Sequence, residues 1–155
     1  MALEKYNTKR DFEKTAEPEG RVESVKGSDL IFVIHKHDAS RLHYDLRLEM
    51  NGVLKSWAVP KEPPIEEGVR RLAVNVEDHP LGYANFEGTI PEGQYGAGTV
   101  EIWDKGRFIP EKVGKDEIIF ELLGKKMNGR YVLVKVKPNP RFKGENNWLF
   151  FRKKE

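Results

Sequence analysis

The chain has 155 residues, a net charge of +2 and no cysteine, so disulfides, zinc fingers and thiol catalysis are excluded. Hydrophobic residues make up 38% and charged residues 34%, which is typical of a globular protein with a well-solvated surface. The sequence shows no apolar run as long as a membrane span and no apolar signal segment, so we expect a cytoplasmic protein. We expect one domain over residues 1–155.

Residues 1–28 carry few apolar side chains and no sustained period, so we predict an N-terminal arm, extended or with a short helix at most. Residues 29–155 alternate short apolar or β-branched segments with turn residues, which predicts a mainly β fold. A barrel or sandwich with its long loops at one mouth fits this pattern. The expected strands are 30–34, 42–49, 53–59, 71–76, 99–103, 117–122, 131–136 and 148–152.

Turn signals separate these strands. Asn51-Gly52 predicts a tight hairpin, and Asn128-Gly129 predicts a second tight turn. The prolines in 61–68 require a loop. The segment 82–98 is a long loop rich in glycine and proline, and loops of this length in compact domains are commonly functional.

All four histidines lie between His35 and His79, and three of them fall within 35–43. Strand alternation separates a polar face from an apolar face in 42–49. The polar face offers His43 and Asp45, two residues apart, which can reach one metal ion. His37 stands before a loop, 38–41, that can fold it back as a third ligand. Such a set suits Mn²⁺, Fe²⁺, Co²⁺ or Zn²⁺ and leaves coordination positions open. The polar face is His43, Asp45, Arg47 and Glu49, and the apolar face is Leu42, Tyr44, Leu46 and Leu48.

Arg47 follows the metal ligands on the same face, where it points either to a buried ion pair with Glu49 or Glu77 or to bidentate phosphate binding. On a barrel strand, we expect the Arg47 side chain to face inward. His79 ends a strand and can reach the same cleft, to donate protons or hydrogen bonds to a phosphate. Weaker candidates for the same anion are Tyr83, Lys61 and Arg71.

The last third of the chain is basic, with ten Lys and Arg against two Glu from Gly124 onward. Such asymmetry fits either a polyanionic partner or a solvated surface. If a nucleic-acid duplex binds there, Lys125, Lys126 and Arg130 are the expected contacts.

Three other functions compete with phosphate chemistry. An iron-dependent oxygenase could use His43, Asp45 and His79, but residues 87–92 lack the expected basic residue for a cosubstrate carboxylate. A cupin could use His35 and His37, but no glutamate follows at the expected spacing. A non-catalytic nucleic-acid-binding barrel accounts for the basic third but not for the metal cluster.

Several blocks together resemble the 3′-phosphoesterase domain family of bacterial DNA ligase D, in its free-standing form. They cover nearly the whole chain. The matching blocks are Lys9-Arg-Asp-Phe12, Thr15-Ala-Glu-Pro18, 37–49, Ser56-Trp-Ala-Val-Pro-Lys61, Glu77-Asp-His-Pro80 and 86–98.

The resemblance implies a compact single-domain β-barrel of about eight strands, with the N-terminal arm over 1–28 and short helical pieces. It implies a Mn²⁺-dependent enzyme of non-homologous end joining that removes 3′-terminal ribonucleosides and 3′-phosphates; Co²⁺ or Zn²⁺ are alternatives. DNA or RNA-tailed DNA 3′ ends would be substrates, a separate DNA ligase a partner, and the protein a monomer.

The resemblance also assigns roles to residues. His37, His43 and Asp45 would hold the metal, and Arg47, His79 and Tyr83 would contact the scissile phosphate. His35 stands where many family members have glutamine, and would either replace its hydrogen bonding or add a ligand. Positions that support activity in the family correspond to Arg10, Asp11, Glu17, Lys61, Arg71 and Glu77.

Overall fold

The computed structural model describes residues 3–10, 12, 17 and 30–154. Most of the N-terminal arm, including Asp11, therefore lies outside the described residues. The described elements in chain order are α1 (Glu4–Thr8), β1 (Ile31–Asp38), β2 (Leu42–Met50), β3 (Val53–Val59), β4 (Arg70–His79), the 3₁₀ helix η1 (Leu81–Asn85), β5 (Gly88–Ile90), β6 (Gly98–Val113), β7 (Glu117–Leu123), β8 (Asn128–Lys135) and β9 (Asn147–Arg152).

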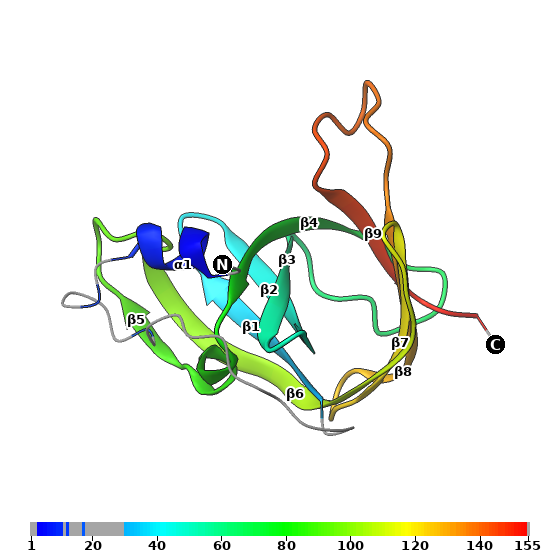
Figure 1. The fold of residues 1–155 in the computed structure, drawn as a ribbon, viewed down its shortest axis with the longest axis horizontal. Helices are drawn as coiled ribbons and strands as arrows, with labels where there is room; N and C mark the ends of the chain where they lie inside the picture. The colour runs from blue at the N-terminus through cyan, green and yellow to red at the C-terminus, as the bar shows by residue number, and fades with distance from the viewer. Residues whose placement is uncertain (1–2, 11, 13–16, 18–29, 155) are drawn as a thin grey trace.

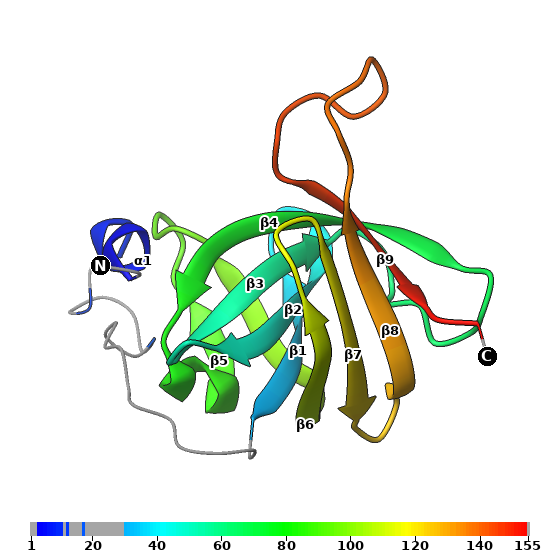
Figure 2. The same ribbon diagram turned by 45° about the vertical axis from the view of Figure 1, so that its right-hand side comes forward.

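The strands form an antiparallel sheet that closes on itself. Its order is β1-β2-β3-β4-β9-β8-β7-β6-β5, and β1 also pairs with β6. Eight strands therefore make a ring, with β5 attached to β6 outside it (Figures 1 and 2). The predicted β-barrel of about eight strands is confirmed. No helix in the described ranges has the length and apolarity needed to cross a membrane.

The barrel interior is filled by alternate side chains from all parts of the ring. Leu46 and Leu48 of β2 meet Phe120 of β7 and Phe150 of β9 in one apolar cluster, and all four are fully buried. The predicted apolar face of 42–49 is thus a core face, except that Leu42, at the start of β2, is exposed.

A second apolar cluster lies against the outside of this wall. It joins Tyr6 of α1 to Val33 of β1, Leu54 of β3 and the η1 region. Figure 1 shows α1 and β5 beside β1–β3, outside the ring that runs through β4, β9, β7 and β6. Because Leu46 and Leu48 point into the barrel, Arg47 between them points outward into this layer. Our expectation of an arginine facing into the barrel was therefore wrong, and the polar cluster does not lie in a barrel mouth.

The Asn51-Gly52 hairpin is confirmed: both residues have positive φ, 54° and 80°, and Met50 pairs with Val53. The second predicted turn is wrong, because Asn128 and Gly129 begin β8 and pair with β7. The chain turns earlier, where the buried carboxylate of Asp104 accepts backbone N–H bonds from residues 125–127. This long-range cap overrides the local Asn-Gly preference.

Two predicted segments are also more ordered than expected. The first strand continues past Ile34 to Asp38, and so carries His35 and His37. The 82–98 loop contains most of η1 and the whole of β5.

Candidate metal and phosphate site

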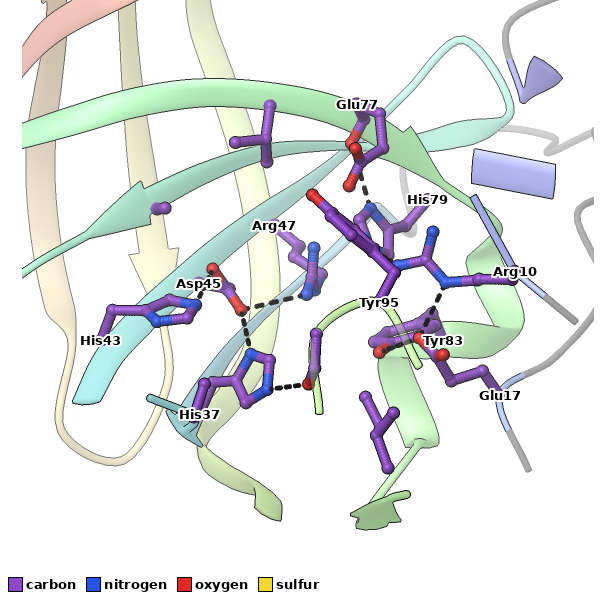
Figure 3. Close-up of a pocket in the computed structure, with 15 residues that line it drawn as sticks. Arg10, Glu17, His37, His43, Asp45, Arg47, Glu77, His79, Tyr83 and Tyr95 are labelled. Atoms are coloured by element: carbon purple, nitrogen blue, oxygen red, sulfur yellow. Dashed lines mark hydrogen bonds and ion pairs between the residues drawn. The ribbon is translucent and has the colours of Figure 1, made fainter. Parts of the chain in front are cut away.

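Three side chains on the outer face of β1 and β2 form a candidate metal site. His37 of β1 lies directly opposite His43 of β2, and Asp45 follows two residues further along β2. One nitrogen of each ring and one oxygen of Asp45 lie within 4.8 Å of one another (Figure 3). Strand pairing, rather than folding of the 38–41 loop, brings His37 to this position.

Backbone carbonyls fix the orientation of both rings. His37 Nε2 lies 2.7 Å from the Gly96 carbonyl oxygen, and His43 Nδ1 lies 3.2 Å from that of Arg41. Each of these nitrogens therefore donates its hydrogen to a carbonyl. The other ring nitrogens, His37 Nδ1 and His43 Nε2, face Asp45 at 3.6 and 3.2 Å, and each can offer its lone pair to a metal ion when it carries no proton. Two oriented imidazoles and one carboxylate fit a divalent transition metal.

Asp45 carries the negative charge of the cluster. Burial would raise the pKa of its carboxyl group, but Arg47, His37 and His43 outweigh burial and hold that pKa well below its ordinary value. His43 is the most exposed of the three ligands, and its hydrogen bond with Asp45 raises the pKa of the His43 ring. Asp45 is thus ionised and available to a cation at neutral pH.

Arg47 is fixed beside the cluster by three acceptors. Its Nε donates to His35 Nδ1 at 3.1 Å, its Nη1 to Ser56 Oγ at 2.9 Å, and its Nη2 to Asp45 Oδ2 at 3.3 Å. The Tyr83 ring lies 4.8 Å from the guanidinium carbon. A guanidinium has five N–H groups, so one remains on each Nη for a ligand. The expected ion-pair partners Glu49 and Glu77 are not used; the partner is Asp45.

His35 stands behind Arg47. Its Nε2 donates to the Phe86 carbonyl oxygen at 3.0 Å, and its Nδ1 accepts from Arg47. Burial, reinforced by the charge of Arg47, lowers the pKa of His35 to about 3, so the ring is neutral. Both nitrogens are occupied, which favours a role in positioning Arg47 over a role as a metal ligand.

His79 reaches the site from the end of β4 because of a bulge. Leu54 pairs with His79 while Ser56 pairs with Val76, so the register shifts by one residue; an unbroken register would set Asp78 opposite Leu54. His79 Nδ1 lies 3.0 Å from the Glu77 carbonyl oxygen, and its Nε2 lies 3.3 Å from Arg10 Nη2. Burial, then Arg47 and Arg10, hold the pKa of His79 well below its ordinary value.

Residues of the arm complete the far side of the site. Arg10 Nε and the Tyr83 hydroxyl both donate to Glu17 Oε2, at 2.9 and 2.6 Å. Arg10 also lies over the Tyr6 ring, 3.9 Å from its centroid. The Tyr83 hydroxyl therefore donates its hydrogen bond to Glu17, and the face of the Tyr83 ring packs against Arg47.

One cavity of about 290 Å³ connects these groups. The predicted residues that line it are Arg10, Glu17, His37, His43, Asp45, Arg47, Glu77, His79 and Tyr83 (Figure 3). Lys61 and Arg71 do not line it; they line a separate cavity where β3 ends and β4 begins. The structure therefore does not place these two residues on the same anion as Arg47.

Three contributors to this site were missed in the sequence. Ser56 is fully buried and accepts from Arg47, and its oxygen lies 3.5 Å from His79 Nδ1. Gly96, within the predicted 82–98 loop, supplies the carbonyl that orients His37. Tyr95 beside it lines the cavity. Ser56 could have been found from the hairpin register, which sets it opposite Arg47.

Comparison with known proteins shows the family of this chain. Residues 35–135 match the family model described as the DNA ligase D 3′-phosphoesterase domain. This segment contains the whole metal cluster, Arg47, Ser56 and His79.

Three relatives illustrate the similarity. The multifunctional non-homologous end joining protein LigD of Pseudomonas aeruginosa is 48% identical over 159 residues, covering 99% of this chain and 19% of that protein. The DNA repair protein LigD of Mycobacterium tuberculosis is 50% identical over 86% of this chain and 18% of its own length. LigD of Mycolicibacterium smegmatis is 44% identical over 99% of this chain and 21% of its own length. The chain thus spans about a fifth of the relatives it matches, and it belongs to the DNA ligase D 3′-phosphoesterase domain family.

Proposed function

We propose that this protein is a metal-dependent phosphoesterase that processes 3′ ends of DNA or RNA-tailed DNA in non-homologous end joining. It would hydrolyse 3′-phosphates to 3′-hydroxyls and remove 3′-terminal ribonucleosides, with Mn²⁺ as the metal. The observation that carries the proposal is that one small cavity contains both an oriented metal-ligand cluster and two buried arginines.

The metal ligands and the arginines would have different roles toward a bound phosphate. His37, His43 and Asp45 would hold the ion, which when bound supplies positive charge for a phosphate oxygen and lowers the pKa of a water ligand. Arg47 offers its two remaining N–H groups to phosphate oxygens. Because Arg47 is already held by His35, Ser56 and Asp45, it needs little rearrangement to stabilise charge that develops during the reaction.

His79 and Arg10 flank the opposite side of the cavity. His79 is neutral, with Nδ1 donating to the Glu77 carbonyl and Nε2 accepting from Arg10. A phosphate dianion placed against Nε2 favours protonation of the ring. Protonated His79 either donates a hydrogen bond to the phosphate or passes its proton to the leaving oxygen, while Arg10 turns a donor toward the same phosphate.

The geometry does not favour the oxygenase alternative. That function requires His79 as a ligand beside His43 and Asp45, whereas the metal-ligand group among the described residues contains His37 instead. A purely binding barrel would not need two oriented imidazoles around an ionised buried carboxylate.

Release of inorganic phosphate tests the proposal directly. The 155-residue chain is incubated with Mn²⁺ and a primer-template whose recessed primer ends in a 3′-phosphate. We expect stoichiometric phosphate release by the wild type and none by Asp45→Asn. Binding of the primer-template without phosphate release under any divalent transition metal would reject catalysis.

A further inference from the structure

A second cavity, of about 480 Å³, lies beyond the metal site where β3 ends and β4 begins. Its described lining combines four cationic side chains with four uncharged residues, and none of these is acidic. The cations are Lys61, Arg70, Arg71 and Arg141, and the other four are Pro60, Leu72, Phe142 and Leu149.

The positive charge of this cavity is not neutralised within the described part of the chain, where none of the four cations forms an ion pair. Arg71 Nε donates to the Glu62 carbonyl oxygen at 2.7 Å. Arg70 and Arg141 lie over the rings of Phe151 and Phe142, each 5.2 Å from the centroid. Arg71 also borders a smaller cavity that contains Glu62 and Glu66. Aromatic rings orient two arginines here while their N–H groups stay available to an anion.

Strand β4 connects the two cavities. Val76, Glu77 and His79 line the metal cavity, and Arg70 and Arg71 line the second. Val76 stands five positions after Arg71 along β4, which is roughly 17 Å at about 3.3 Å per residue. Along one strand of a duplex this distance corresponds to roughly five nucleotides at about 3.4 Å each.

We propose that the second cavity binds a backbone phosphate of the nucleic acid several nucleotides from the 3′ end that occupies the metal cavity. This inference rests on the proposed function and adds a second contact to it. It makes turnover depend on substrate length, because a substrate of one or two nucleotides cannot reach both cavities.

The cavity is also a better phosphate site than the basic residues expected from the sequence. Arg130 is paired with Glu111, and Lys126 lies over the Trp103 ring, 4.4 Å from its centroid. Neither these two nor Lys125 lines either cavity. From the basic last third of the chain, Arg141 lines the second cavity.

The test compares two double variants with the same change in charge. Arg70→Gln with Arg141→Gln removes two cations from the second cavity, and Lys125→Gln with Lys126→Gln removes two from the β7–β8 turn. Affinity for a primer-template is measured by fluorescence anisotropy over a series of salt concentrations. Phosphate release is measured with the 3′-phosphorylated primer-template and with a 3′-phosphorylated dinucleotide.

We expect the Arg70/Arg141 variant to bind the duplex on the order of tenfold more weakly and to show a salt slope smaller by about one to two. Its turnover of the dinucleotide should equal that of the wild type, and the lysine variant should match the wild type throughout.

Equal losses on the duplex and the dinucleotide, unchanged duplex binding, or an equal loss in the lysine variant would each overturn the inference. If the wild type releases phosphate from neither substrate, the proposed function itself fails. The two failures are therefore distinguishable.

Discussion

Strands β2 and β7 belong to the same barrel but bury their outer faces very differently. On β7, Ile118, Phe120 and Leu122 are buried and their neighbours are not, so the outer face meets water. On β2, every residue from Tyr44 to Glu49 is buried, which includes the charged side chains Asp45, Arg47 and Glu49.

This difference distinguishes the wall that carries the candidate site from the rest of the barrel. Burying charged groups costs free energy unless each has partners, and such groups are weak contributors to stability even when paired. Strand β7 buries only the face that packs into the barrel core. The wall formed by β2 retains a hydrogen-bonded polar layer beneath α1 and η1, as expected of a wall that holds a reactive site.

Of the variants considered, Asp45→Asn on β2 should have the largest effect on metal binding and turnover. It removes the charge that holds the metal while it keeps a hydrogen-bond acceptor for Arg47, so we expect loss of both metal binding and turnover. Isothermal titration with Mn²⁺ and phosphate release measure the two effects. Glu121→Gln, on the outer face of β7, is the matched control and should retain both. Undiminished turnover by Asp45→Asn would exclude a metal role for Asp45.

Arg47→Ala and His79→Ala should separate charge stabilisation from metal binding. Each should lower turnover on the order of 10²-fold or more, because each acts on the phosphate in the transition state. Metal affinity should be largely retained in both. If either variant lost the metal in a titration, that residue would belong among the ligands and its proposed role would be wrong.

Ser56→Ala should lower turnover less than Arg47→Ala does, because Ser56 acts by holding Arg47 in position. It removes the acceptor of Arg47 Nη1 at 2.9 Å, and we expect kcat to fall about tenfold, in line with an unsatisfied buried donor costing about 1–3 kcal/mol. In a double-mutant cycle, Ser56→Ala should add almost nothing to Arg47→Ala. Additive losses would show that Ser56 acts independently of Arg47. Ser40→Ala, in the exposed turn after β1, is the control.

Metal binding should show a modest dependence on pH. The pKa of His43 is raised by its hydrogen bond to Asp45, so below that pKa a metal must displace a proton from the ring. Affinity should therefore rise with pH and level off above the pKa of His43. Titration calorimetry in buffers of different ionisation enthalpy should detect proton release on the acidic side. Constant affinity and no proton release would exclude His43 as a ligand.

The sequence predicted those parts of the site that depend on local geometry better than the parts that depend on long-range contacts. Alternation along 42–49 was enough to place His43, Asp45 and Arg47 on one face, and the Asn51-Gly52 hairpin fixes the register that sets Ser56 opposite Arg47. It could not show which face points outward, because β2 buries both faces.

Long-range features were beyond local patterns. A one-residue bulge between β3 and β4 turns His79, rather than Asp78, toward the cavity. Closure of β1 against β6 and the cap supplied by Asp104 join residues that are far apart in the chain. Lys61 and Arg71 were assigned to the phosphate at the metal, but they lie at the far ends of their strands in another cavity.

A metal titration of activity tests the central claim most directly. The 155-residue chain is stripped of metal with a chelator and returned to metal-free buffer. Mn²⁺ is then added in increasing amounts while phosphate release from a 3′-phosphate primer-template is followed. We predict no release without metal and a rise to a plateau near one equivalent of metal per chain. Full release by the stripped protein, or no release at any metal concentration, would contradict the account.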